Sequence, residues 1–209
     1  MEQRTDEWFQ ARLGKVTASM LGAVTSKIKT GESATRKSYK IQLITERLTG
    51  KKADTYINAA MQHGIDTEDE AKMSYILAHG EVEEAGFVDH PTIPMTGASP
   101  DGYVGEDGLI EIKCPQPNTH TETLLTGKFK RNYLYQMQWQ MACTNRKWCD
   151  FVSYNGSFPE HLQMYVQRVE RDDKLIKELE DEVTEFLNEV GELMETMNDS
   201  TQDKIKDKE

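Results

Sequence analysis

The stretch between residues 99 and 114 constrains the fold of this chain more than any other. The cluster Gly105-Glu106-Asp107-Gly108 is typical of a tight turn, and residues 109–114 alternate apolar and polar side chains, which is typical of a half-buried β-strand. These features predict two antiparallel strands joined by a turn. The alternation places Glu111 and Lys113 on one face of the second strand.

The length of the turn decides whether Asp101, on the first strand, joins this polar face. A two-residue turn at Asp107-Gly108 places Asp101 on the opposite face. A three-residue loop at 106–108, with Gly108 in the left-handed region, pairs Asp101 with Lys113 and places Glu111 diagonally. Only loops of odd length bring the three polar side chains together.

If these side chains converge, they form a site with two carboxylates and one ammonium group. Carboxylate oxygens are the ligands that hard divalent cations prefer, so the hairpin is a candidate metal site. The alternative is an exposed hairpin whose charges face solvent, because Asp-Gly turns with nearby Glu and Lys are common. The hairpin alone leaves both interpretations open.

Length and composition favour one globular domain, which we place at residues 1–197, in a chain of 209 residues. No apolar run approaches the length of a membrane span, and the polar start of the chain is unlike a signal peptide. The three cysteines form no CxxC pair, and the five histidines show no HxxxH or HExxH spacing. This argues against disulfides, structural zinc and a His-based metal site, and we expect a cytoplasmic protein.

Charge is distributed unevenly along the chain. The formal net charge is −11, and most of the excess acid follows residue 150. There a long amphipathic helix is predicted at 172–197, followed by a disordered tail at 198–209. Residues 25–52, by contrast, carry eight Lys and Arg against two Glu. Such a local basic face can bind phosphate groups in an acidic protein, and the alternative is an ordinary solvated helix face.

A second candidate site lies near the N-terminus. Thr5 and the acids after it predict the start of a short helix that carries Trp8 and Arg12 one turn apart. The next helix is predicted to begin at Val16-Thr17-Ala18-Ser19. Two hydroxyl groups at a helix start, just after an arginine, suit a phosphate group, although ordinary capping is the simpler explanation for this segment alone.

The order Asp, then Glu-x-Lys, resembles the PD-(D/E)xK nuclease superfamily, and longer strings resemble the phage lambda exonuclease family, also called YqaJ-type viral recombinases. The strings are Trp8-x-x-x-Arg12-Leu13-Gly14-x-x-Thr17-Ala18-Ser19, Gly64-x-x-x-Glu68, Ser99-Pro100-Asp101-Gly102, Glu111-Ile112-Lys113-Cys114-Pro115 and Gln136-x-Gln138, in this order. The resemblance implies an α/β (α+β) fold with a restriction-endonuclease-like core, in which helices flank a central mixed β-sheet.

The resemblance also implies an activity. It implies a 5′→3′ exonuclease, as in members of this family, that acts on 5′-phosphorylated ends of double-stranded DNA, releases 5′-mononucleotides and leaves 3′ single strands for annealing. It implies two Mg²⁺ ions per active site, which Mn²⁺ can replace. It further implies a ring-shaped homotrimer around DNA, a phage single-strand annealing protein as partner, and a phage or prophage protein in the bacterial host cytoplasm.

Family positions assign roles to individual residues. The expected metal ligands are Asp101, Glu111, Glu68 and the backbone carbonyl of Ile112. Asp101 would bridge two ions about 3.5–4 Å apart. Lys113 would orient or deprotonate the attacking water, because a lysine near cations loses its proton more easily, and Gln136 would position Lys113 or the water.

The same resemblance implies two DNA contact regions. The expected 5′-phosphate pocket consists of Trp8, Arg12, Thr17, Ser19 and Ser99, and a DNA channel would include Lys37, Lys40, Lys128, Lys130 and Arg131. A second arginine of the family's pocket falls at about Thr119 here, with His120 beside it. Either phosphate discrimination is weaker than in the family, or Lys128, Lys130 or Arg131 takes over the role of that arginine.

Two other functions remain open from the sequence. An endonuclease or junction resolvase can use the same core, but it needs no pocket for a terminal phosphate, so the string from Trp8 to Ser19 argues against it. The other alternative is a DNA-binding module with a nuclease fold and no catalysis. The joint presence of Asp101, Glu111 and Lys113 argues against that alternative.

Overall fold

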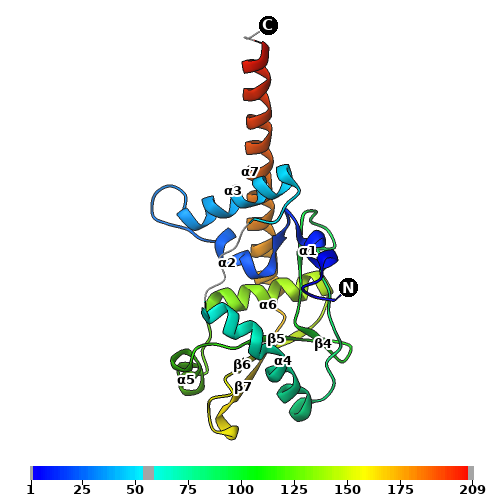
Figure 1. Cartoon of the computed structure of the whole chain (residues 1–209), viewed down its shortest axis with the longest axis vertical. Helices are drawn as coiled ribbons and strands as arrows, with labels where there is room; N and C mark the ends of the chain where they lie inside the picture. Colours follow the sequence, from blue (N-terminus) through cyan, green and yellow to red (C-terminus); the bar gives the residue numbers. More distant parts are fainter. Residues whose placement is uncertain (1, 54–58, 207–209) are drawn as a thin grey trace.

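The structure, a computed structural model, describes residues 2–53 and 59–206 and has a mixed four-stranded sheet at its centre (Figure 1). The strand order is β4 (Gly102–Val104), β5 (Gly108–Lys113), β6 (Trp148–Tyr154) and β7 (Met164–Glu170). β5 and β6 are parallel, while β4 and β7 run antiparallel to their neighbours. A smaller sheet has the order β1 (Val16–Thr17), β3 (Thr96–Ala98), β2 (Val88–Asp89). The predicted mixed sheet with flanking helices is confirmed.

The helices cover the sheet and connect its strands. They are α1 (Asp6–Arg12), α2 (Leu21–Val24), α3 (Ala34–Thr49), α4 (Ala59–His79), α5 (Pro117–Thr126), α6 (Arg131–Thr144) and α7 (Asp173–Lys206), with 3₁₀ turns η1 (Ala18–Met20) and η2 (Glu160–Leu162). α5 and α6 form the crossover between the parallel strands β5 and β6, which no short turn can join. None of the described helices combines the length and the apolar composition that a membrane span requires.

The β4–β5 hairpin has a loop of odd length, as the convergence of its polar residues requires, but at a different register from the expected one. The loop is Gly105-Glu106-Asp107, because Val104 pairs with Gly108 and Gly102 with Ile110. Gly105, with φ of 55°, is the left-handed residue, not Gly108. The expected pairing of Asp101 with Lys113 is therefore wrong.

Gly108 serves a different purpose from the predicted one. It pairs with Trp148 on β6, and a Cβ atom at this position would lie 2.1 Å from the Trp148 ring. The glycine thus allows the indole to pack directly on the first residue of β5. A glycine is needed at this position for close packing and not for a positive φ.

Helix α6 lies between the sheet and the α2–α3–α7 layer, as Figure 1 shows. Met137 and Met141, one turn apart, pack with Leu109 and Phe151 of the sheet. Trp139, on the other side of the helix, packs in the cluster formed with α2, α3 and α7. Because both sides are covered, residues 137–143 of α6 are buried, and this fixes the position of the helix relative to β5.

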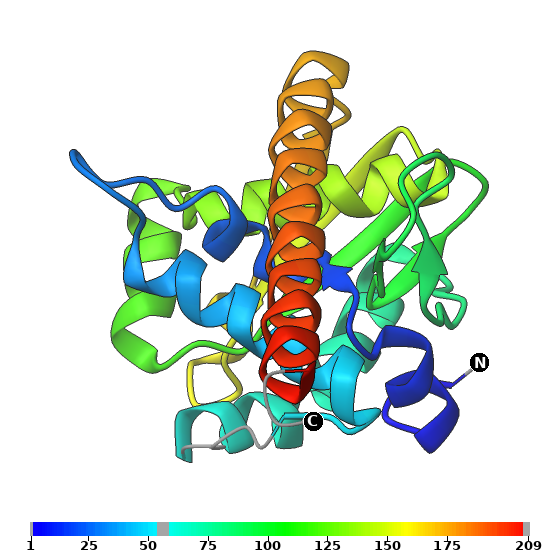
Figure 2. The same cartoon turned by 90° about the horizontal axis from the view of Figure 1, so that it is seen from above.

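Helix α7 packs on α3 through an apolar stripe and lies over the other elements in the view from above (Figure 2). It then extends beyond the body of the molecule (Figure 1). Leu179, Val183, Phe186 and Val190, at helical spacing, are buried. The sequence predicts disorder from residue 198, but α7 continues to Lys206, and residues 207–209 lie outside the described residues.

The N-terminal segment also differs from its prediction. Val16 and Thr17 do not begin a helix: they form β1, which pairs in parallel with β3, and the helical turns follow. Val16 is fully buried, and this β-branched residue fits the small sheet.

A group of ion pairs fastens α3 to α7. Glu189 accepts hydrogen bonds from Arg36, at 2.5 and 2.8 Å, and from Lys40, at 2.7 Å. Glu32 pairs with the same two cations. Lys40 is only 8% exposed and has two carboxylate partners, so its charge is used inside the protein. These contacts argue against its predicted place in a DNA channel, which remains a prediction.

Because of these ion pairs, the stability of the fold is expected to decrease as the pH falls through the acid range. Hydrogen bonds from Arg36 and Lys40 outweigh burial and lower the pKa of Glu189 to about 2. A carboxylate whose pKa is lowered on folding stabilises the fold above its unfolded pKa, about 4.5, and this contribution disappears as pH falls towards 2. We expect Glu189→Gln to reduce stability at neutral pH and to flatten the decline between about pH 4.5 and 2.

Chemical denaturation across this pH range measures the effect. Glu192→Gln, which changes an exposed carboxylate of the same helix, is the matched control and should keep the wild-type slope. Equal slopes for wild type and Glu189→Gln would contradict the assignment.

Candidate active site

Asp101, Glu111 and Lys113 meet at the β4–β5 hairpin. Asp101 Oδ2 accepts a 2.6 Å hydrogen bond from the backbone N–H of Ile112. Glu111 is 1% exposed and ion-paired with Lys113, whose ammonium nitrogen lies 5.1 Å from the centre of the Tyr133 ring. The predicted convergence of two carboxylates and an ammonium group is therefore observed, and the exposed hairpin is excluded.

Helix α6 holds the Glu111 carboxylate from the other side. Gln136 Nε2 donates to Glu111 Oε1 at 2.7 Å, and Gln140 Nε2 donates to Oε2 at 2.6 Å. The expectation that Gln136 positions Lys113 or a water differs from this arrangement, because its amide contacts Glu111 directly. Gln140 was not among the predicted site residues, although its position one helical turn after Gln136 is a usable signal.

The electrostatics of the group show unbalanced negative charge. Burial raises the pKa of Asp101 well above its ordinary value, and the charges of Glu111 and Glu68 raise it further. Burial acts to lower the pKa of Lys113, but the neighbouring Glu111 and Asp101 charges outweigh it and raise that pKa. Lys113 is therefore protonated here and compensates only part of the negative charge.

Glu68, on α4, completes the acidic group. Burial and the Glu111 charge raise its pKa, while Arg4 opposes this shift. Arg4 Nη2 lies 2.6 Å from Glu68 Oε2, so this carboxylate already has a cationic partner. Within residues 2–53 and 59–206, no group of three or more His, Cys, Asp or Glu side chains is arranged to hold a metal ion.

The donor set nevertheless has the chemistry of a hard-cation site. Asp101, Glu111 and Glu68 offer oxygen donors, and a cation among them would relieve the repulsion that raises the pKa of Asp101. The described contact at Ile112 involves its N–H, so the role of its carbonyl remains a prediction.

Arg4 was not among the predicted site residues. It lies in the left-handed region, with φ of 69°, and the preceding Gln3 donates to the carbonyls of Ala85, at 3.0 Å, and Pro100, at 2.6 Å. These bonds fasten the N-terminal segment beside Asp101. A single positive-φ arginine has no sequence signature, which explains why pattern analysis misses it.

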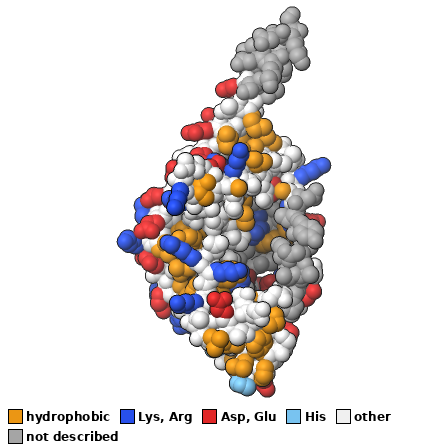
Figure 3. All heavy atoms as spheres, turned by 90° about the vertical axis from the view of Figure 1, so that its left-hand side faces the viewer, with side chains coloured by type: hydrophobic (Ala, Val, Ile, Leu, Met, Phe, Trp, Pro, Cys, Tyr) orange, Lys and Arg blue, Asp and Glu red, His pale blue; other side chains and the backbone are white. Residues whose placement is uncertain are grey.

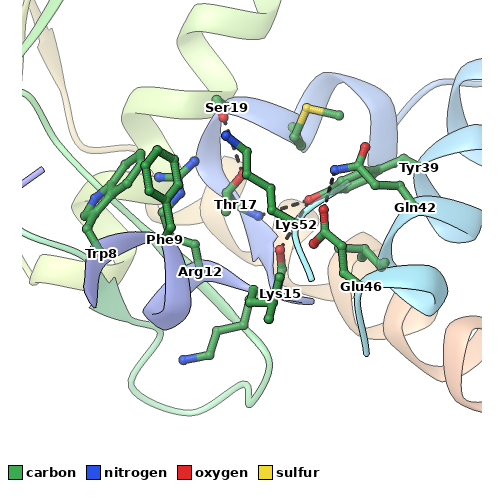
Figure 4. Close-up of a pocket in the computed structure, with 13 residues that line it drawn as sticks. Trp8, Phe9, Arg12, Lys15, Thr17, Ser19, Tyr39, Gln42, Glu46 and Lys52 are labelled. Carbon is green, nitrogen blue, oxygen red and sulfur yellow. Dashed lines mark hydrogen bonds between the residues drawn. The ribbon is translucent and has the colours of Figure 1, made fainter. Parts of the chain in front are cut away.

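The predicted phosphate-pocket residues also come together. Ser99 Oγ accepts hydrogen bonds from Trp8 Nε1, at 2.9 Å, and Arg12 Nη1, at 3.0 Å. The Arg12 guanidinium lies 4.0 Å over the Trp8 ring. Thr17 and Ser19, with Oγ atoms 3.3 Å apart, line the same pocket, which Figure 4 shows.

Arg12 is a desolvated cation at the wall of this pocket. Burial lowers its pKa to about 10, although Tyr39 and Glu46 oppose the shift. Glu46, the nearest acid of the pocket, instead accepts hydrogen bonds from the N–H of Gly14, at 3.0 Å, and from Gln42, at 2.9 Å. A guanidinium with little solvent and, among the described residues, no bonded carboxylate is suited to bind an anion.

The two sites are adjacent because Ser99 and Asp101 are separated by a single residue. Ser99 is hydrogen-bonded to Arg12 of the pocket, and Asp101 is part of the acidic group. Two residues of extended chain span at most ~7 Å. The phosphate pocket and the acidic group therefore lie within reach of one bound strand.

The remaining predicted cations lie on the surface. Lys37, Lys128, Lys130 and Arg131 are exposed, and Arg131 lies 5.2 Å from the Tyr135 ring centre. On the face shown in Figure 3, Lys and Arg side chains spread over the middle, whereas Asp and Glu lie mainly at the edges. No described contact tests the channel, which remains a prediction.

The family resemblance implies a second pocket arginine at about Thr119, and this position does not contribute to the Arg12 pocket. Thr119 is on α5 and is not among the residues that line the Arg12 pocket. His120 is fully buried, and its ring nitrogens contact Ser153 Oγ and the Leu162 carbonyl, each at 2.8 Å. This histidine supports the fold rather than a phosphate.

Comparison with solved structures shows that the chain has the nuclease fold of alkaline exonucleases. It is similar to the alkaline exonuclease LHK-Exo from Laribacter hongkongensis, with 51% identity, a TM-score of 0.89, and coverage of 95% of this chain and 99% of that chain. The structure of LHK-Exo in complex with dAMP gives 50% identity, the same TM-score and the same coverage. A phage-related exonuclease from Haemophilus somnus 129PT shares the fold, with 18% identity, a TM-score of 0.73, and coverage of 88% and 96%.

The chain belongs to the YqaJ-like viral recombinase family, whose model matches residues 7–147. The matched range contains all of α1 but its first residue, the hairpin and α6, and hence most of both candidate sites. No curated protein matches the sequence.

Proposed function

We propose that this chain is a metal-dependent 5′→3′ exonuclease on 5′-phosphorylated ends of double-stranded DNA. In this proposal it releases 5′-mononucleotides and leaves 3′ single strands for annealing. The adjacency of an anion pocket at Arg12 and an acidic group at Asp101 carries the proposal, because an exonuclease must hold a terminal phosphate beside the bond it cleaves. The similarity to LHK-Exo, an alkaline exonuclease, supports the reaction class.

Asp101, Glu111 and Glu68 would hold Mg²⁺, or Mn²⁺ in its place. Two such ions supply a nucleophilic water at neutral pH and neutralise the charge that develops on the phosphate. Gln136 and Gln140 keep both oxygens of Glu111 in a fixed orientation, so the ligand is preorganised before DNA arrives.

Lys113 orients the attacking water in this proposal. Facing uncompensated carboxylates it stays protonated and can donate a hydrogen bond but cannot accept a proton. Cations on Asp101 and Glu111 would remove this bias and let Lys113 act as a base. The aromatic ring of Tyr133 limits where its ammonium group can move.

At the other site, Arg12 and Ser99 would grip the terminal phosphate, with Thr17 and Ser19 as further hydrogen-bonding groups. The Trp8 ring supports the Arg12 guanidinium from one side. Ser99 is hydrogen-bonded to both Trp8 and Arg12, so the pocket is preformed.

The metal site gives the first prediction of this proposal. With linear end-labelled duplex and Mg²⁺, the wild-type protein should release 5′-mononucleotides from the 5′ end. Asp101→Ala should abolish cleavage, because it removes the shared ligand, while DNA binding is retained. Asp107→Ala, which changes an acid of the same hairpin paired with Lys147, should keep the activity.

Wild-type turnover by Asp101→Ala would overturn the assignment of the metal site. Cleavage of closed circular DNA by the wild-type protein would favour an endonuclease instead. Binding without cleavage in both Mg²⁺ and Mn²⁺ would favour a DNA-binding module.

The end pocket gives a separate prediction. A charge-assisted Arg–phosphate contact contributes ~1.5–3 kcal/mol, so Arg12→Ala should reduce kcat/KM on 5′-phosphorylated ends by roughly 10- to 100-fold. The reduction should be much smaller on 5′-hydroxyl ends, which lack the contact. Gln10→Ala, an exposed change on the same helix, should affect neither substrate. Equal losses on both ends would contradict a phosphate role for Arg12.

Assembly and partner are further proposals. A ring-shaped homotrimer would place basic surfaces such as that in Figure 3 around DNA and keep the acidic α7 segments outside. A phage single-strand annealing protein would take up the 3′ strand. One chain has a mass of 23.9 kDa. Light scattering at micromolar concentration should give three times this mass, and the mass of a single chain would contradict the ring.

A further inference from the structure

The terminal phosphate in the proposed function requires more positive charge than Arg12 supplies. A phosphate monoester carries a charge of about −1.5 to −2 at neutral pH, whereas each internal phosphodiester carries one negative charge. A single guanidinium matches an internal phosphate as well as a terminal one. Selection of a 5′-phosphorylated end therefore calls for a second cation, and the following inference rests on the proposed end pocket.

Among the residues that the structure describes, the pocket offers one further cation without an ion-pair partner. The cationic side chains that line it are Arg12, Lys15 and Lys52. Lys15 is already ion-paired with Asp89, at 2.6 Å, and its end points away from Thr17 and Ser19 in Figure 4. Neither Arg12 nor Lys52 has a carboxylate within ion-pair distance among residues 2–53 and 59–206.

The local backbone explains how Lys52 reaches the pocket. Gly50 ends α3 in the left-handed conformation, with φ of 64°, and turns the chain back across the helix end. The N–H of Ala53 then donates to Glu46 Oε1 at 3.3 Å. Because Glu46 also binds the N–H of Gly14, it joins this loop to the one that follows α1.

The Lys52 side chain then extends across the pocket. Its ammonium nitrogen lies 4.2 Å from the centre of the Phe9 ring on α1. In Figure 4 its end points toward Thr17 and Ser19. The apolar stem and the aromatic contact orient the charge without neutralising it.

We propose that Lys52 is the second cation of the end pocket and a specificity residue for the phosphate monoester at a 5′ end. Arg12 and Lys52 approach the pocket from different elements, α1 and the loop after α3, so together they can contact one dianionic group. The surface cations Lys128, Lys130 and Arg131 do not line this pocket.

The test uses the full-length protein and two linear duplexes that differ only in a 5′-phosphate or a 5′-hydroxyl end. Lys52→Met keeps the apolar stem and removes the charge. It should lower kcat/KM on the phosphorylated end on the order of tenfold, with an effect of less than about twofold on the hydroxyl end. Lys52→Arg should retain most of the preference.

Two measurements separate a pocket role from general DNA attraction. Lys51→Met removes the neighbouring exposed charge, which does not line the pocket, and should leave the end preference unchanged. Fluorescence anisotropy in EDTA, without cleavage, should show the same loss of preference for the phosphorylated duplex in Lys52→Met. Thermal unfolding should be unchanged, because Lys52 is exposed.

An unchanged end preference in Lys52→Met, or equal losses on both ends, would overturn the inference. Arg12→Ala, measured in parallel, distinguishes this from failure of the proposed function. If Arg12→Ala loses the preference and Lys52→Met keeps it, only the role of Lys52 is refuted. If neither variant changes the preference, the end pocket itself is refuted.

Discussion

The buried carboxylate of Glu111 is the group on which the rest of the site depends. A charge that is 1% exposed is tolerated only when it is paired and hydrogen-bonded. Gln136 and Gln140 from α6 and Lys113 from β5 supply these partners. These contacts form only when α6 lies at one position across the sheet. The hydrogen bonds that the buried Glu111 carboxylate needs therefore fix the crossover helix relative to the hairpin.

The link between the two candidate sites follows from the same arrangement. Ser99 and Asp101 lie on the segment that leaves β3 and enters β4, so the small sheet and the central sheet meet there. The Arg12 pocket lies beside the small sheet, and the acidic group lies beside the central sheet. A DNA end bound at this junction would place its terminal phosphate and its first cleavable bond at fixed positions, which is the positioning that phosphoryl-transfer chemistry requires.

Charges on α3 are divided between structure and surface. Arg36 and Lys40 form ion pairs with Glu189 that hold α7 against α3, whereas Lys37 on the same helix is exposed. Helical spacing alone therefore does not identify a DNA-binding face, because the acidic partners come from an element about 150 residues later in the chain. The acidic excess of the C-terminal part thus contributes in part to folding.

The sequence by itself determined the local features: the strand alternation around Glu111, the Thr5 cap, the apolar stripe of α7, and the strings that identify the family. These depend on neighbouring residues, whose spacing is visible in one dimension. Only the tertiary structure decided the loop register, the pairing of Lys40, and the contacts of Gln140, Arg4 and Lys52. Gly108 shows the reason: its lack of a side chain serves the Trp148 ring on another strand, and such packing between distant segments leaves no local pattern in the sequence.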